Sequence, residues 1–161
     1  MAANNALEVY LNDHLAGSTA GRDLARKLVN DTAGTPHTQV MESLLADIEA
    51  DRETLEDVIH RLEIERQALK QAASWAAEKV GQLRFIGAVT RSEDLSLLLE
   101  METLSMGIHA KSALWQALGE ALATDPRVAG IDFDSLVKRA QDQIDRLEAP
   151  REAAAARAFA A

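Results

Sequence analysis

Apolar residues recur at helical spacing along almost the whole chain, and few residues interrupt them. Alanine, leucine, glutamate, aspartate and arginine dominate, whereas aromatic residues make up only 4% and β-branched residues are sparse. This combination has high helix propensity and low strand propensity. With 161 residues, the chain is long enough for one domain with its own core. The sequence therefore predicts a single all-α domain.

Breaks in the helical pattern divide the chain into five predicted helices. The stretch NDTAGTP separates the first two, because Gly34 can end one helix while Thr35 and Pro36 can start the next. The apolar stripe changes phase near Glu63, and DPRVAGIDFD precedes the last helix. We expect helices at residues 6–30, 36–63, 66–83, 92–123 and 132–150, followed by an Ala-rich tail at 151–161.

Two further signals bear on the helix ends. Thr90 and Glu93 have the spacing of a capping box, which would start the fourth helix. Pro150 lacks a backbone N–H and is expected to kink the fifth helix or to end it. Whether that helix continues into the tail is left open by the sequence.

Two long helical hairpins joined by a short crossover helix would form an antiparallel four-helix bundle. This order of helices, from about Ala6 to Glu148, resembles that of ferritin-like proteins. The resemblance implies the fold, and it directs attention to a metal centre in the bundle core. Ferritin-like di-iron proteins carry histidines three residues after a glutamate.

The di-iron motif itself does not occur in this chain. The residues three positions before His14 and His109 are Leu11 and Met106. Asp57-Val58-Ile59-His60 has a suitable spacing, but it lies on the outer side of its helix. The ferroxidase and oxygenase activities of the family are therefore not expected here.

Polar side chains nevertheless interrupt three of the predicted buried faces. His14 lies on the first helix, Asp51 on the second, and Glu102, Ser105 and His109 on the fourth. Lys111 is assigned to the opposite, wetter face of the fourth helix. Depth along each hairpin predicts a buried contact between His14 and Asp51. It also predicts a Glu102 to Arg151 pair if the fifth helix passes Pro150.

Two interpretations of these polar groups remain open. In the first, they form a buried network that fixes helix register. In the second, His14, Asp51, Glu102 and His109 supply ligands for one iron, manganese or zinc ion. No P-loop, dinucleotide-binding glycine pattern or nucleophile elbow occurs, so no catalytic residue is assigned.

Charge and hydropathy restrict the partners and the location. The net charge of -9 argues against binding to nucleic acid or to an anionic membrane. Without cysteine, disulfides and zinc-thiolate sites are excluded. The chain has no signal-peptide pattern and no apolar run of about 20 residues, so a cytoplasmic location is expected.

One apolar edge predicts a homodimer. Ile108 and Trp115 of the fourth helix and Trp75 of the crossover helix would form it, unless the crossover helix covers that edge within the monomer. Taken together, the sequence favours a non-catalytic ferritin-like bundle with a structural, binding or stress-related role. The alternative is a metalloprotein with one iron, manganese or zinc ion in its core.

Overall fold

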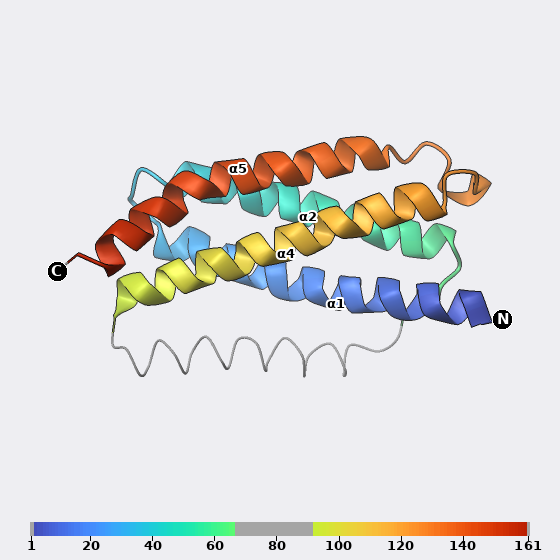
Figure 1. Cartoon of the computed structure of the whole chain (residues 1–161), viewed down its shortest axis with the longest axis horizontal. Coiled ribbons are helices and arrows are strands. Elements are labelled where there is room, and N and C mark those ends of the chain that lie inside the picture. The colour runs from blue at the N-terminus through green and yellow to red at the C-terminus, as the bar shows by residue number, and fades with distance from the viewer. Residues whose placement is uncertain (1, 67–91, 161) are drawn as a thin grey trace.

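The computed structural model describes residues 2–66 and 92–160, and these ranges contain helices and no strand (Figure 1). The helices are α1 (Ala2–Asp31), α2 (Thr38–Arg61), α4 (Glu93–Ala121), the 3-10 helix η1 (Pro126–Val128) and α5 (Phe133–Ala158). The predicted all-α class is confirmed. The helix predicted at 66–83 lies, apart from its first residue, outside the described residues. None of the described helices carries an apolar stretch that could cross a lipid bilayer.

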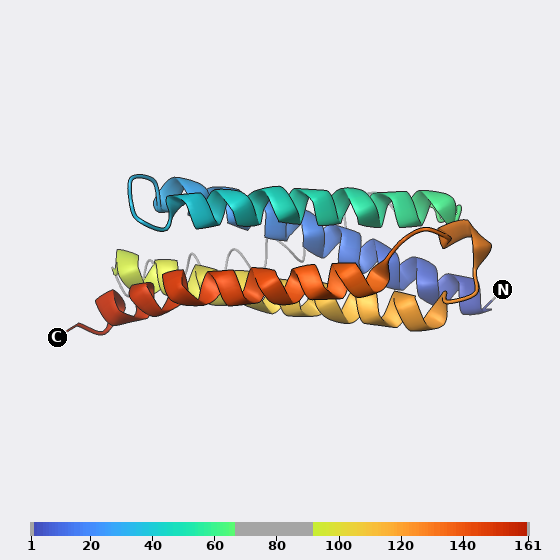
Figure 2. The same ribbon diagram turned by 90° about the horizontal axis from the view of Figure 1, so that it is seen from above.

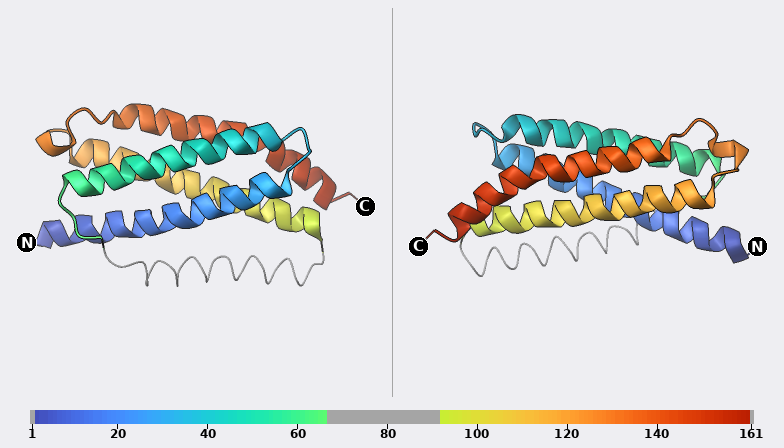
Figure 3. Two further views of the ribbon diagram at one scale, coloured as in Figure 1. Left: turned by 180° about the vertical axis from the view of Figure 1, so that it is seen from behind. Right: turned by 45° about the horizontal axis from the view of Figure 1, so that its top comes forward.

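The four long helices pack side by side as a bundle (Figures 1 and 2). Helix α1 contacts α2 and α4, and helix α5 contacts α4 and α2. The turn between α1 and α2 lies at one end of the bundle, and the connection through η1 lies at the other, as both views in Figure 3 show. We call these the turn end and the loop end.

Threonine hydroxyls organise the turn end. Thr32 is buried, and its Oγ1 donates to the Leu28 carbonyl at 2.8 Å. Thr35 and Thr38 donate to the Thr32 carbonyl at 2.7 and 2.6 Å, and Gly34 takes the left-handed φ of 75°. Helix α2 therefore begins at Thr38, two residues later than predicted, because Thr35 belongs to the turn.

Helix α2 ends at Arg61, two residues earlier than predicted. Glu63 has a φ of 55°, and the Ile64 N–H bonds back to the Ile59 carbonyl at 3.1 Å. This closure leaves the helical path without glycine, which is why the sequence did not show where α2 ends.

Side-chain caps start α4 and α5. The Ser92 hydroxyl accepts from the Leu95 N–H at 3.2 Å, whereas the predicted cap residue Thr90 lies outside the described residues. Asp132 accepts from the Ser135 N–H at 2.9 Å and caps α5. Both residues satisfy backbone donors that have no partner inside the helix.

Helix α5 passes through Pro150 and continues to Ala158, beyond the expected bound at residue 150, so the possibility that Pro150 ends the helix is wrong. Pro150 itself is buried, and Ala154 beyond it is fully buried in the core. Arg157 Nε donates to Asp94 Oδ1 of α4 at 2.8 Å. Packing and this ion pair offset the lost backbone hydrogen bond, and Figure 1 shows α5 changing direction over its last turns.

Buried apolar residues form two clusters along the bundle. The turn-end cluster consists of Ala25, Leu28, Met41, Leu44, Ile48, Leu98, Met101, Leu104, Ile108, Ala140, Leu147 and Ala154. The loop-end cluster consists of Leu11, Leu55, Val58, Ile59, Leu62, Leu114, Trp115, Leu118, Val128 and Leu136. The gap between the two clusters contains Asp51 on α2, Lys111 on α4 and Arg139 on α5.

Candidate functional site

Asp51 is the centre of a buried polar network between the two clusters. It lies on α2 between Ile48 and Leu55, and only 1% of its surface is exposed. The sequence pattern had placed it inside the apolar row of this helix, and its burial confirms that placement. A buried carboxylate is stable only with charged or hydrogen-bonding partners, and three side chains from α4 and α5 provide them.

Two cations bind the Asp51 carboxylate from different helices. Lys111 Nζ of α4 forms an ion pair with Asp51 Oδ2. Arg139 of α5 donates from Nε to Asp51 Oδ1 at 2.8 Å, and its Nη2 contacts the same oxygen. Both carboxylate oxygens are therefore occupied by charge-assisted hydrogen bonds.

Gln143 completes the network from α5. Its side chain is fully buried, and its Nε2 donates to Asp51 Oδ2 at 2.8 Å. Its Oε1 accepts from Lys111 Nζ. Because the amide both donates and accepts, it links the anion to the ammonium and leaves neither of its own atoms without a partner.

Burial and charge act on Lys111 in opposite directions. Desolvation lowers the pKa of the Lys111 ammonium, and the nearby Arg139 guanidinium lowers it further, while the Asp51 and Asp47 carboxylates oppose this shift. Asp47 in turn forms an ion pair with Arg146, which also donates to Ser43 Oγ at 2.8 Å. The ionic contacts thus continue along the interface of α2 and α5 towards the turn end.

His14 does not reach this network, so the predicted contact with Asp51 is wrong. Its ring lies edge-on to Tyr10, with centroids 4.6 Å apart. Burial lowers the pKa of His14, and Asp13 opposes that shift. An ammonium and a guanidinium are stronger partners for a buried carboxylate than a histidine that favours its neutral form.

His109 is exposed, which corrects its predicted place in the buried face of α4. Its Nδ1 lies 3.0 Å from the Ser105 carbonyl of its own helix. The buried face is centred instead on Leu104, Ile108 and Trp115, roughly a third of a turn around the helix from His109.

Glu102 and Arg151 lie near each other, but at the surface. Arg151 Nη1 is 3.6 Å from Glu102 Oε1, and the side chains are 28% and 44% exposed. Arg151 has a closer partner in Glu148, to which its Nε donates at 3.0 Å. The expected buried pair is thus a partly solvated ion pair beside a stronger one.

The four candidate metal ligands each have different surroundings. His14 contacts Tyr10, Asp51 binds Lys111 and Arg139, Glu102 lies beside Arg151, and His109 faces its own backbone. Within residues 2–66 and 92–160, no three histidine or carboxylate side chains gather as a group that could hold a metal ion.

Three members of the network were missed from the sequence, although spacing could have revealed two of them. Lys111 lies three residues after Ile108 and four before Trp115, on the most buried row of α4. Gln143 lies three residues after Ala140 and four before Leu147, on the buried row of α5. A polar residue inside each row predicts a partner for Asp51. Arg139 lies beside this row and gives no such signal.

The apolar edge expected to form a homodimer is not available at the surface. Ile108 and Trp115 are 2% and 1% exposed, because they pack inside the two clusters. Trp75 lies outside the described residues. These residues of α4 therefore stabilise the monomer core.

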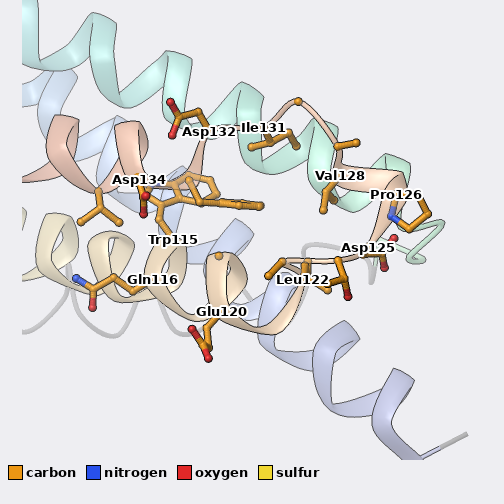
Figure 4. Close-up of a pocket in the computed structure, with 17 residues that line it drawn as sticks. Trp115, Gln116, Glu120, Leu122, Asp125, Pro126, Val128, Ile131, Asp132 and Asp134 are labelled. Carbon is orange, nitrogen blue, oxygen red and sulfur yellow. The ribbon is translucent and has the colours of Figure 1, made fainter.

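A hollow of about 660 Å³ lies at the loop end, where the connection between α4 and α5 curves over Trp115 (Figure 4). The indole Nε1 of Trp115 is buried and has no hydrogen-bond partner in the described part of the chain. At the rim, Arg127 binds the Asp125 carboxylate and lowers its pKa to about 2. Gln116 and Glu120 project from α4 away from the loop (Figure 4). The polar groups thus do not converge on a ligand position.

A larger hollow, of about 1030 Å³, lies at the turn end between α1, the turn and the start of α4. Lys27 crosses it and contacts Asp31 at 2.5 Å and Glu100 at 2.6 Å. Arg157 pairs with Asp94 on the same side. Lys27 and Arg157, which line the hollow, are thus already paired with carboxylates. The Asp51 network, which is far more buried, is the stronger candidate site.

Comparisons with protein-family models, with curated proteins and with solved structures found no match to this chain. Function is therefore inferred from the geometry of the described residues.

Proposed function

We propose that this chain is a non-catalytic helical-bundle protein with a structural or binding role, in which an ionic network replaces a metal centre. The proposal rests on one observation: both carboxylate oxygens of Asp51 already bind side chains of this chain. Lys111 and Arg139 bind both of its oxygens, and Gln143 bridges the anion to the lysine. A metal ion binding Asp51 would have to displace a tethered cation from a nearly dry site.

The chemistry of the network supports a structural role. A buried charge left alone is strongly unfavourable, so each partner restricts where the others can lie. The network joins α2, α4 and α5 at one level, with apolar clusters on both sides. Its proposed role is to select one relative register of these three helices.

The connectivity supports a ferritin-like architecture as part of the proposal. At the loop end, Arg61 at the end of α2 donates to the Ala129 carbonyl beside η1. At the turn end, Arg157 joins the start of α4. The chain between α2 and α4 must therefore connect opposite ends of the bundle, as the one long crossover of ferritin-like bundles does. Such a connection would make α2 and α4 parallel, and the proposed architecture is two antiparallel hairpins, α1 with α2 and α4 with α5, joined by it.

The alternative is a protein that binds one iron, manganese or zinc ion through His14, Asp51, Glu102 and His109. It requires these side chains to converge, whereas the described contacts pair each with a different neighbour. We therefore favour the ionic network.

Elemental analysis of protein purified without chelator tests the proposal. We expect less than stoichiometric iron, manganese and zinc, and the same melting temperature with and without a chelator. Stoichiometric metal that is lost in Asp51→Ala would refute the ionic replacement, because metal binding to the folded state raises its stability.

A further inference from the structure

We infer that Lys111 fills a cation site formed by Asp51 and Gln143, and that this site will bind a small primary ammonium ion when the lysine side chain is removed. The inference deepens the proposed function and rests on it. It assigns a ligand class, primary alkylammonium, to the network.

The contacts around Lys111 Nζ define the site. Asp51 Oδ2 accepts from the ammonium, and so does Gln143 Oε1. One acceptor is charged and the other is neutral, and they come from two different helices. A primary ammonium has three N–H donors, so it can bind both oxygens at once.

The two acceptors are held in place without the lysine. Asp51 Oδ1 is fixed by Arg139 Nε at 2.8 Å, and Gln143 Nε2 donates to Asp51 Oδ2 at 2.8 Å. Asp51 and Gln143 are 1% and 0% exposed. Replacing Lys111 with alanine therefore leaves two oriented acceptors in a protected position.

The lysine stem provides the entry path. The side chain of Lys111 is 16% exposed, whereas Asp51 at its far end is 1% exposed. The methylene groups thus lead to a buried ammonium, which is the reverse of the usual arrangement in which the stem is buried and the charged head reaches water. Lys111→Ala removes three carbons and the nitrogen, which together are n-propylammonium in size and charge.

Propylammonium rescue of Lys111→Ala tests the inference. The measurement is the melting temperature of the full chain, in the presence of a chelator and at constant ionic strength. We expect the substitution to lower the melting temperature by roughly 10 °C, because it leaves a buried carboxylate with one cation fewer. Propylammonium chloride should recover about half of that loss or more, with a saturating dependence on concentration.

Matched compounds and variants separate the ammonium site from other effects. Propan-1-ol has the same carbon chain without the charge, and tetramethylammonium has the charge without N–H donors. Lys111→Met fills the channel with a neutral side chain, and Lys138→Ala removes an exposed lysine outside the network. None of these compounds should rescue Lys111→Ala, and propylammonium should rescue neither control variant.

Three results would overturn the inference: no rescue, equal rescue by propan-1-ol or by sodium chloride, or equal rescue of the control variants. If Lys111→Ala does not fold alone, its refolding yield with each compound is measured by the same criteria. Because the chelator removes metal from every sample, failure of the rescue is distinct from the discovery of metal in the wild-type protein.

Discussion

The turn-end and loop-end clusters lie on opposite sides of Asp51 and fill space in different ways. The turn-end cluster contains the fully buried alanines Ala25, Ala140 and Ala154, together with larger aliphatic and methionine side chains. The loop-end cluster contains Trp115, which lies 6.3 Å from Phe133 between ring centroids. Small residues let helices approach closely, whereas a large ring fills a wider gap.

From this comparison we expect the ionic layer, rather than the apolar clusters, to specify helix register in this bundle. Apolar clusters tolerate exchanges of similar volume, so they restrict helix register only loosely. The ionic layer between them is intolerant, because moving one partner separates opposite charges in a dry site. Substitutions in the ionic layer and in each apolar cluster test this difference separately.

Asp51→Ala should have the largest effect. It leaves Lys111 and Arg139 in the protein without their shared anion, and the free energy of unfolding should fall by about 3–5 kcal/mol. Urea denaturation measures this loss. Asp57→Ala is the control, since Asp57 is exposed and pairs with Arg61 at the surface, and it should change stability by at most about 1 kcal/mol. Equal losses would show that the network has no special weight.

Leu44→Ala and Leu118→Ala compare the two clusters directly. Each side chain is almost fully buried, at 0% and 1% exposed, and each loss should be about 2–5 kcal/mol. Hydrogen exchange should show the larger loss of amide protection in the cluster that carries the substitution. If both variants lose protection equally along the whole bundle, the two clusters form one cooperative unit and the division made here is wrong.

Ser92→Ala tests the turn end at its surface. The hydroxyl accepts from the Leu95 N–H and caps α4, so its loss should cost about 1 kcal/mol. Thermal denaturation measures the effect, and Ser92→Asp is the matched variant because its carboxylate can cap the same N–H. A loss as large in Ser92→Asp as in Ser92→Ala would contradict the capping role.

His14→Gln should have the smallest effect, seen as a change in pH dependence. Because burial lowers the pKa of His14 in the folded state, the unfolded chain binds more protons between that lowered pKa and 6.5. The contribution of His14 to stability is therefore complete above pH 6.5 and is lost as the pH falls through this window. Stability measured from pH 7 to pH 5 should fall less steeply in His14→Gln. The exposed control His60→Gln should follow the wild type.

Much of the fold could be predicted from the sequence, because helical periodicity is a local signal. The all-helical class and the turn at Gly34 follow from it. The end of α2 could not be predicted, since Glu63 takes a left-handed conformation without the glycine that usually marks it. Continuation through Pro150 depends on Ala154 and Arg157 contacts that only the folded bundle provides.

Of the candidate site, the sequence predicted the buried Asp51 but not the side chains that bind it. Asp51 interrupts an apolar row and is buried as expected. Its partners were not predicted. Lys111 was expected on the solvent-facing side of α4, although its spacing from Ile108 and Trp115 places it on the same buried row as these two residues. Counting from the turns suggested a pair of His14 with Asp51, but depth along a helix does not determine the direction in which a side chain points.

Helix α1 is the member of the bundle that supplies no described side chain to the Asp51 network. It is joined to the others by apolar packing and by surface pairs such as Arg26 with Glu49 and Lys27 with Glu100. The ionic network therefore connects α2, α4 and α5 directly, whereas α1 packs against α2 and α4 without taking part in it. We therefore expect an inserted or deleted helical turn to cost less stability in α1 than in α2, α4 or α5, where it would separate members of the Asp51 network.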